Sequence, residues 1–275
     1  MSAENKSLDI FKFAGMVCLA CSLVVSVSAV ALRGLQTQNA NNEMKINILR
    51  AAGLAGADEK LSAAKIDEKF KEVVPVVVEL ATGELDKSKN PLEYKMYAAA
   101  QNNQDGRALS EDPANIKRIA KHGSAYVLLK GDDIDRLILP IQGYGLWSTM
   151  YGFTALTFKN EQPEIAGITF YQQAETAGLG SRITEPAWQS KFEGRLPYDS
   201  NGKPQLEIVK TKSSYDDNQV EAIAGATLTS KGVENMMNFW LGEQGYQPFV
   251  ERIVGGEIDA QALRDASQAA AAQDQ

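Results

Sequence analysis

The first hydrophobic segment of the chain runs from Phe13 to Leu32 without a single charged residue. A helix needs about 20 apolar residues to cross the hydrocarbon core of a bilayer, so we expect a transmembrane helix at residues 13–32. A cleaved signal peptide is the alternative, because Ala29-Val30-Ala31 is similar to a cleavage site. The apolar run exceeds the ~7–15 residues of a signal peptide, and residues 1–12 have no net positive charge. We therefore predict a retained anchor that follows a short N-terminal segment.

After the anchor, the pattern changes to short apolar elements separated by polar turns. Alternating and β-branched runs predict strands, whereas apolar residues recurring every three or four positions predict helices. The segment Gln36–Asn42 is typical of a polar linker, and residues 82–115 predict loops. We expect short helices at 44–50, 63–73 and 186–192, strands at 76–80 and 206–210, hairpins pairing 125–130 with 136–141 and 153–158 with 165–171, and a helix after Ser230.

Strands in hairpins with helices at their edges predict an α+β fold. Beyond the anchor we expect three parts. Residues 33–124 form a linker and a helical and strand segment packed on the main domain, which occupies residues 125–255. Residues 256–275 form a tail whose Ala, Ser, Gln and Asp content is typical of disorder.

Charge and rare residue types exclude several functions. A net charge of -7 without a stripe of Lys, Arg and aromatic residues argues against nucleic-acid binding. The single histidine, His122, cannot build a His-rich metal site, and we expect it in a surface loop. The two cysteines, Cys18 and Cys21, lie in the apolar segment, where we interpret them as small packing residues. We therefore expect no metal site and no disulfide framework.

The stretch Ala224–Ser230 combines small residues with three hydroxyls and precedes an amphipathic helix. One interpretation is a tight turn into a helix whose N-cap is Thr229 or Ser230. The other is an anion site, because a helix N-terminus offers unpaired N–H groups and a positive dipole end to a phosphate. The stretch alone leaves both interpretations open.

Two further stretches, residues 143–152 and 175–181, are dense in glycine and follow expected strands. Glycine with apolar and hydroxyl side chains suits a site for a flat, partly polar ring. Neither stretch has the Walker or the Rossmann pattern. Each stretch alone is typical of a turn, but three such loops at strand ends in one domain indicate a binding site.

Together these stretches resemble a known family. Gly145–Gly152, Glu175–Gly180 and Gly225–Ser230 are similar to signature blocks of the C subunits of the sodium-translocating NADH:quinone reductases, and Phe239–Glu243 fits as well. The resemblance runs in order from the membrane helix to about residue 250. It implies a soluble flavin-binding domain at 125–255 that carries one covalent FMN, attached by a phosphoester bond to the threonine of the last block, Thr227.

The sequence departs from the family pattern at three positions. Glu221 stands where the family usually has Asp, Ala224 where it has Ser or Thr, and Ala177 where Pro is common. Glu221 keeps the carboxylate, and Ala224 loses a hydroxyl other than the one that would be modified. These changes would affect how efficiently a flavin transferase recognises the site.

The resemblance and the residues together indicate which side chains meet the flavin. Hydroxyl and backbone N–H donors would bind the polar edge of the ring, and the α-helix start would support the phosphate. No catalytic acid or base and no metal ligand is expected, and Glu175 is expected to position a loop. The expected FMN-binding residues are Thr227 as the attachment point, Gly225, Ala226, Leu228, Thr229, Leu146, Trp147, Ser148, Glu175, Thr176, Leu179 and Gly180.

The implied function is electron transfer in a complex that oxidises NADH, reduces ubiquinone and pumps sodium. The implied partners are membrane subunits that hold a metal centre, a second FMN-bearing subunit, the flavin transferase and membrane lipid, but no nucleic acid. The chain would be a single-pass protein of the bacterial inner membrane with its flavin domain on the periplasmic side. It would not bind NADH itself, since it has no dinucleotide fingerprint.

Two alternatives remain at this point. The first is the G subunit of the related ferredoxin:NAD electron-transport complex, which usually lacks a segment like residues 34–124 and the Leu-Trp-Ser-Thr-Met-Tyr block. The second is a membrane-anchored binding protein without a cofactor, in which the glycine-rich loops are only turns. Covalently bound flavin would separate the second alternative from the others.

Overall fold

The computed structural model describes residues 3–56, 59–159 and 162–272. The chain divides into two compact units, Met1–Met44 and Lys45–Gln275. The first unit is helical from Ala3 onward, as part of α1 (Ala3–Ala51). The most apolar 18-residue window of this helix has a mean hydropathy of 2.3, and none of it is buried. By length and composition the helix is able to cross a membrane, as expected for residues 13–32.

The polar linker expected at Gln36–Asn42 is wrong, because α1 continues through it to Ala51. The segment contains neither Pro nor Gly. Gln is a good helix former, and Asn costs only a fraction of a kcal/mol. A polar composition alone therefore does not interrupt the helix, and the short helix expected at 44–50 is the end of α1.

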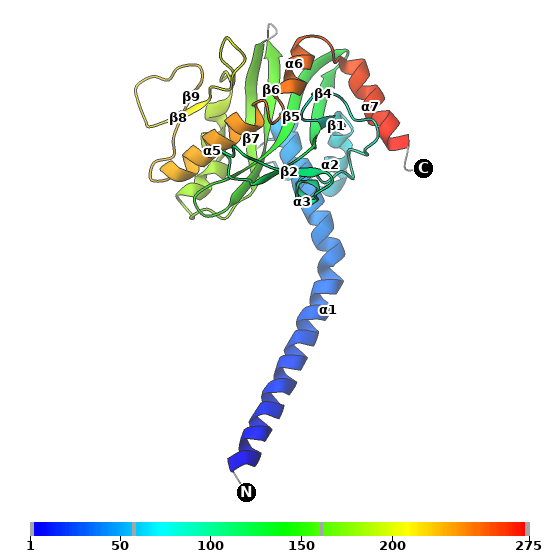
Figure 1. The fold of residues 1–275 in the computed structure, drawn as a ribbon, viewed down its shortest axis with the longest axis vertical. Helices are drawn as coiled ribbons and strands as arrows, with labels where there is room; N and C mark the ends of the chain where they lie inside the picture. The colour runs from blue at the N-terminus through cyan, green and yellow to red at the C-terminus, as the bar shows by residue number, and fades with distance from the viewer. Residues whose placement is uncertain (1–2, 57–58, 160–161, 273–275) are drawn as a thin grey trace. The chain divides into compact units, whose positions relative to one another are not determined.

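The second unit is built on a five-stranded antiparallel sheet in the order β1-β4-β5-β6-β7 (Figure 1). Both expected hairpins are present, one in β4 and β5 and one in β6 and β7. The register pairs Tyr126 with Ile138 in the first hairpin and Phe153 with Thr169 in the second. The strands are β1 (Val73–Glu79), β4 (His122–Lys130), β5 (Asp133–Tyr144), β6 (Thr149–Lys159) and β7 (Gln162–Gln172).

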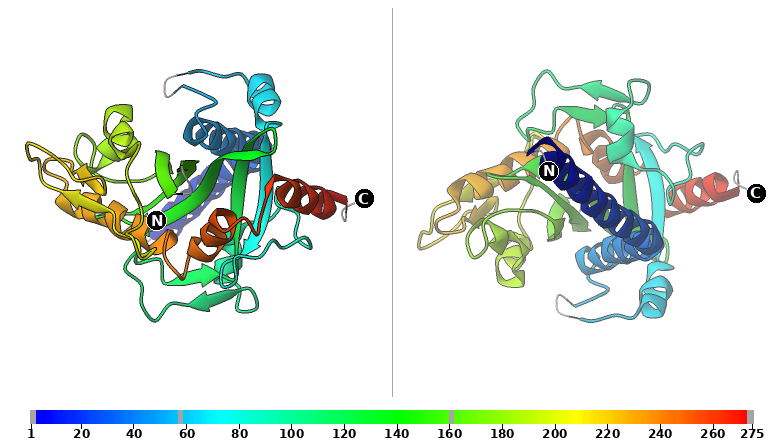
Figure 2. Two further views of the ribbon diagram at one scale, coloured as in Figure 1. Left: turned by 90° about the horizontal axis from the view of Figure 1, so that it is seen from above. Right: turned by 90° about the horizontal axis from the view of Figure 1, so that it is seen from below.

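Both faces of this sheet are covered, which explains why β5 is apolar without alternation. On one face α5 (Thr227–Trp240) lies close to β5, and Trp240 Nε1 donates to the Gln142 carbonyl at 2.7 Å. On the other face, Thr169 Oγ1 donates to the carbonyl of Asn47, near the end of α1, at 3.4 Å. Figure 2 shows α6 (Gln247–Val254) and the end of α1 on opposite sides of the green strands.

The remaining helices and small sheets lie around this core. Residues 82–115, expected as loops, contain α3 and β2, and a short parallel pair of strands follows the sheet. The fold is the expected α+β type. The further elements are α2 (Ala63–Phe70), α3 (Met96–Gln101), β2 (Gly106–Ala108), β3 (Arg118–Ala120), the 3₁₀ helix η1 (Gly180–Thr184), α4 (Pro186–Gln189), the 3₁₀ helix η2 (Ser190–Phe192), β8 (Glu207–Val209), β9 (Gln219–Glu221) and α7 (Ala260–Ala272).

The disorder expected for 256–275 is wrong as far as the structure describes that tail, because α7 spans Ala260–Ala272. Alanine has the highest intrinsic helix propensity, and Leu263 and Ala266 are buried against the core. Arg264 also forms an ion pair with Asp132 at 3.3 Å. The part of the expected tail at residues 273–275 lies outside the described residues.

The surface loop expected for His122 is also wrong. His122 begins β4 and pairs with Glu79 of β1. Its Nε2 lies 3.2 Å from Asp86 Oδ2, and burial is the largest cause that lowers its pKa below the usual 6.5. The prediction rested on the apolar run that begins at Ala125. β4 starts earlier, at His122, because its first residues pair with the edge strand β1.

Candidate functional site

The carboxylate of Glu175 connects the three glycine-dense stretches of the sequence. It accepts hydrogen bonds from the backbone N–H groups of Leu146 (3.1 Å), Trp147 (3.0 Å) and Ser148 (3.0 Å). It also accepts a hydrogen bond from Thr229 Oγ1 at 2.7 Å. The loop between β5 and β6, the segment after β7 and the start of α5 are therefore held by one side chain.

This carboxylate is buried, with Glu175 only 7% exposed. Burial alone would raise its pKa, but hydrogen bonds from Thr229 and the three backbone amides outweigh burial and hold the pKa below the usual 4.5. Charge-assisted hydrogen bonds of this kind are the strong ones in proteins. Glu175 is therefore an ionised acceptor that fixes a loop, in line with the positioning role expected for it.

The close approach of the three segments depends on glycine. A Cβ on Gly180 would lie 2.7 Å from Thr229 Oγ1 and 2.9 Å from Glu175 Cβ. A Cβ on Gly145 would lie 2.6 Å from Glu175 Oε1. Gly225 has a φ of +78°, a conformation that favours glycine, and its Cβ would touch Leu179 Cδ2 at 3.2 Å. The small residues noted in the sequence thus make room for the contacts at the site.

Helix α5 begins at Thr227, with Ala226 as its N-cap and without a side chain that caps it. The N-cap expected at Thr229 or Ser230 is wrong, since both residues lie inside the first turn and are 1% exposed. Thr229 instead donates to Glu175, and Ser230 Oγ accepts from the backbone N–H of Ile223 at 3.1 Å. The first amides of α5 consequently have no partner within the helix and no side-chain cap.

Exposed apolar side chains surround this helix start. Trp147 is 64% exposed and Leu228 61%, and Leu146 and Leu179 are exposed as well. Large apolar side chains on the surface of a soluble unit mark a contact for a ligand or partner when they gather in one place. The contacts through Glu175 and Gly225 bring the loops that carry Leu146, Trp147 and Leu179 to the start of α5.

The expected site residues divide into two groups by exposure. The exposed group is available to a ligand and the buried group supports the loops. Ala226, Glu175, Gly180 and Thr229 are buried. The exposed or half-buried ones are Leu146, Trp147, Ser148, Thr176, Leu179, Gly225, Thr227 and Leu228.

Two residues of this region were missing from the expected FMN-binding residues, although Tyr144 belongs to the glycine-dense stretch 143–152. Tyr144 is 39% exposed and its hydroxyl donates to the Trp147 carbonyl at 3.1 Å. Gly232 lies inside α5, where a Cβ would approach the Tyr144 carbonyl to 2.5 Å. A glycine in a helix interior costs about 1 kcal/mol relative to alanine. A glycine within the helix expected after Ser230 was therefore unusual, and this could have identified Gly232 from the sequence.

Glu221, which departs from the family pattern, lies just before this turn. Its carboxylate forms an ion pair with Lys191 and accepts from Thr211 Oγ1 at 2.6 Å. The hydrogen bond from Lys191 is the largest cause that lowers its pKa below 4.5. The indole N–H of Trp188 donates to the Glu221 carbonyl at 2.8 Å, so side chain and backbone together fix the end of β9.

The residues at this site fit the FMN that the resemblance implies. The uncapped N-terminus of α5 suits a phosphate, and Thr227 at its first position is an exposed hydroxyl. The exposed apolar side chains suit a flat ring, and Gly225 leaves space beside Leu179. Among the described residues, no group of three or more His, Cys, Asp or Glu could hold a metal ion.

Known proteins with similar sequence and structure point to one family. A family model described as FMN-binding domain matches residues 145–242. The C subunit of the Na(+)-translocating NADH-quinone reductase of Pseudomonas aeruginosa is 38% identical over 264 residues, which cover 94% of this chain and 100% of that protein. The C subunit of the Vibrio vulnificus reductase is 36% identical with the same coverage.

The crystal structure of Shewanella oneidensis NqrC is similar to the present fold, with a TM-score of 0.69 and 29% sequence identity. The similarity covers 78% of this chain and 98% of that one. The alignments with the two curated relatives extend over nearly the whole chain, well beyond the FMN-binding domain. This chain therefore belongs to the family of the C subunits of the Na(+)-translocating NADH-quinone reductases.

Proposed function

We propose that this chain is the FMN-carrying electron-transfer subunit of a sodium-translocating NADH:quinone reductase. The observation that carries the proposal is the group of exposed apolar side chains around Thr227, within the region that matches the FMN-binding domain. The relatives above are named as C subunits of such a reductase, which favours this function over the G subunit of the ferredoxin:NAD complex. The chain itself is an electron carrier within the complex and has no NADH site of its own.

We further propose that the FMN is covalent, with one phosphoester bond to Thr227 Oγ1. Attachment forms a P–O bond between this oxygen and the FMN phosphorus and breaks the phosphoanhydride bond of a flavin dinucleotide. A nucleoside monophosphate leaves with the electron pair of that bond, and the hydroxyl proton goes to a base of the flavin transferase. The exposure of Thr227 supports access by that enzyme. The uncapped amides at the start of α5 would stabilise the bound phosphate.

In this proposal the chain positions the cofactor and controls its surroundings. When bound, FMN supplies the redox chemistry. Leu146, Trp147 and Leu179 would exclude water from the ring, and the hydroxyls of Ser148 and Thr176 and nearby backbone amides would donate to its polar edge. Glu175 holds the loop that carries Leu146 in place, because its carboxylate accepts hydrogen bonds from the backbone N–H groups of Leu146 and Trp147.

The proposed location is the bacterial inner membrane, with α1 as a single span and the flavin domain on the periplasmic side. The apolar, exposed character of α1 supports membrane association. The proposed partners are membrane subunits that hold a metal centre, a second FMN-bearing subunit, and the flavin transferase during maturation. The exposed apolar edge around Thr227 suits electron exchange with a partner, because an edge of the flavin would lie at the surface.

The attachment is tested by expressing the full chain together with a flavin transferase and examining denaturing gels for flavin fluorescence. We expect a fluorescent band that disappears in Thr227→Ala and persists in the control Thr37→Ala, which removes an exposed threonine hydroxyl outside the site. Mass spectrometry of the peptide containing Thr227 should show one added FMN. A dark wild-type band would contradict the covalent cofactor, and fluorescence that survives Thr227→Ala would contradict the attachment residue.

The location is tested separately by protease treatment of intact spheroplasts. A periplasmic domain should be digested without lysis, whereas a cytoplasmic control protein should stay intact. Full protection of residues 45–275 in intact spheroplasts would contradict the periplasmic side and leave the covalent attachment unaffected.

A further inference from the structure

The carboxylate of Glu175 is a buried negative charge whose hydrogen-bond partners are all neutral. It accepts from the backbone N–H groups of Leu146, Trp147 and Ser148, from the Thr229 hydroxyl at 2.7 Å and from the Ser148 hydroxyl at 3.3 Å. Among the described residues, no Lys, Arg or His forms an ion pair with it. The charge is therefore held by dipoles and is not cancelled by a counter-ion.

The cations on the adjoining elements have other partners. Lys231 of α5 forms an ion pair with Glu234, and Arg182 of η1 forms one with Glu185 at 3.0 Å. Glu175 itself is only 7% exposed. Salt screens buried charges much less than exposed ones, so the negative potential of Glu175 extends to the residues and ligands around it.

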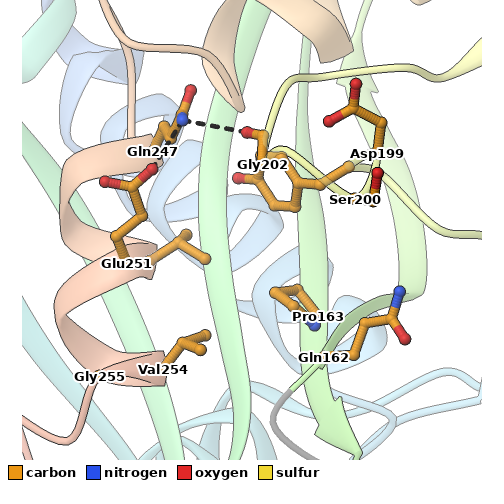
Figure 3. Close-up of a pocket in the computed structure, with 11 residues that line it drawn as sticks. Gln162, Pro163, Asp199, Ser200, Gly202, Gln247, Glu251, Val254 and Gly255 are labelled. Carbon is orange, nitrogen blue, oxygen red and sulfur yellow. Dashed lines mark hydrogen bonds between the residues drawn. The ribbon is translucent and has the colours of Figure 1, made fainter.

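A second carboxylate of the same unit shows the contrast (Figure 3). Glu251 lies on α6 beside a cavity of about 500 Å³ and accepts a hydrogen bond from Gln247 Nε2 at 2.7 Å. Glu251 is exposed, and none of the residues that line this cavity belongs to the three loops around Thr227. Water therefore screens the charge of Glu251, whereas the charge of Glu175 is enclosed by the loops that it holds.

Glu175 lies close to the proposed attachment point of the flavin. Its Oε2 accepts from Thr229 Oγ1 at 2.7 Å, and Thr229 follows Thr227 by two residues in α5. Cα atoms two residues apart in an α-helix are about 5–6 Å from each other, so the carboxylate lies within roughly 11 Å of the Thr227 Cα. It also holds the backbone N–H groups of Leu146 and Trp147, whose side chains are proposed to contact the ring.

We propose that the negative charge of Glu175 lowers the midpoint potential of the FMN at this site. This role rests on the proposed function and adds to the contacts by which Glu175 holds the loop. Two electrons from a partner in the complex and one proton from water give the reduced ring one negative charge. A fixed negative charge nearby opposes that added charge and favours the oxidised form. The reduced cofactor is thereby made a stronger electron donor.

The experiment measures the midpoint potential of the flavin-loaded full chain in detergent, by spectroelectrochemical titration at neutral pH. Glu175→Gln keeps the size of the side chain and removes its charge. Two unit charges about 10 Å apart, at an effective dielectric constant of about 20, change an equilibrium roughly tenfold. We expect the ratio of reduced to oxidised flavin at a fixed potential to rise about tenfold, which is a positive shift of about 30 mV for a two-electron couple.

A second variant separates the effect of charge from that of loosened packing. Thr229→Val keeps the shape of its side chain and the charge of Glu175, but it removes the hydroxyl that donates to the carboxylate. Three amide donors remain, so Glu175 stays ionised with less compensation. We expect a shift to more negative potentials, opposite in sign to that of Glu175→Gln. Loosened packing alone would move both variants in the same direction, and that result would overturn the proposal.

The control Glu251→Gln makes the same change at an exposed carboxylate and should leave the midpoint potential unchanged. An unchanged or more negative potential in Glu175→Gln would also overturn the proposal. If Glu175→Gln does not fold or takes up no flavin, the sign of the shift in Thr229→Val decides. A zero or positive shift in that variant would contradict an effect of the Glu175 charge on the flavin.

Flavin fluorescence on denaturing gels distinguishes a failure of this proposal from a failure of the proposed function. A dark band for the wild type contradicts the covalent FMN and with it both proposals. A fluorescent wild type whose midpoint potential does not respond to Glu175→Gln contradicts the electrostatic role alone.

Discussion

Large apolar side chains are exposed in two regions of the described chain, apart from Leu92. In α1 they recur from Ile10 to Leu35, and Leu23, for example, is 61% exposed. Among these residues no buried polar side chain holds the apolar ones in a fixed position. Around Thr227 they are few, and Glu175 fixes the loop that carries two of them. The two regions share exposed apolar surface and differ in the polar support beneath it.

This difference corresponds to the two environments that we propose for them. Lipid chains are fluid and adapt to any apolar surface, so a membrane helix needs hydrophobicity and length but no fixed shape. A flavin ring is rigid, so its site must be held in advance by supporting contacts. The predictions below remove the support from one region or the hydrophobicity from the other.

The largest effect is expected for Glu175→Leu. This change removes the acceptor of the buried Thr229 hydroxyl and of three backbone amides. With the buried Thr229 hydroxyl and three part-buried amides left without this acceptor, the free energy of unfolding should fall by roughly 4 kcal/mol. Urea denaturation of the full chain in detergent measures it, and Glu193→Leu at an exposed position should change it by less than about 0.5 kcal/mol. Equal losses in the two variants would show that Glu175 supports nothing.

The next effect concerns α1. Leu23→Lys places a charge in the middle of the apolar segment and should make membrane insertion less favourable by about 3 kcal/mol. Alkaline extraction of membranes should then release the variant while the wild type stays in the pellet. Gln38→Lys puts the same charge on the polar part of the same helix and should behave like the wild type. Retention of Leu23→Lys in the pellet would argue against a membrane role for this segment.

A smaller effect is expected for Gly180→Ala, which keeps all polar partners but adds one methyl group. Its Cβ would lie 2.7 Å from Thr229 Oγ1, so the start of α5 and Glu175 would have to move apart. Overpacking of this kind should cost about 2 kcal/mol of unfolding free energy and weaken flavin incorporation. Gly167→Ala is the control, because its Cβ would meet only the Ala51 carbonyl at an ordinary 3.6 Å. Similar stability of the two variants would contradict the tight packing at Gly180.

The sequence predicted the sheet better than it predicted the boundaries of helices. Hairpins follow from alternation and turn residues close in the chain, so β4 to β7 were expected and confirmed. α1 and α7 extend through segments whose polar or alanine-rich composition is compatible with helix as well as with coil. Helix propensity alone does not distinguish helix from coil in these segments. Tertiary packing, such as the burial of Leu263, determines which of the two forms.

The site shows the same division between local and distant information. Glycine, hydroxyl and apolar residues marked the three loops in the sequence, and the structure joins those loops through Glu175 and Thr229. That contact links residues 54 positions apart. The N-cap prediction failed for this reason, since Thr229 donates to a distant carboxylate instead of accepting from its own helix. Local patterns in the sequence marked the loops of the candidate site, and the long-range contact that joins them needed the fold.

The smallest effect comes from adding one proton to the supporting carboxylate. The pKa of Glu175 is lower in the folded chain than the usual 4.5, so its stabilisation is fully present above 4.5 and is lost as the pH falls through the folded-state pKa. The advantage of the wild type over Glu175→Gln in unfolding free energy should therefore be constant near neutral pH and shrink in acid below 4.5. Other acid-sensitive groups, such as Asp86 with its pKa of about 2, cancel in this difference because both chains contain them. An advantage that does not change with pH would mean that the loops around Thr227 are held by the shape of the side chain and not by its charge.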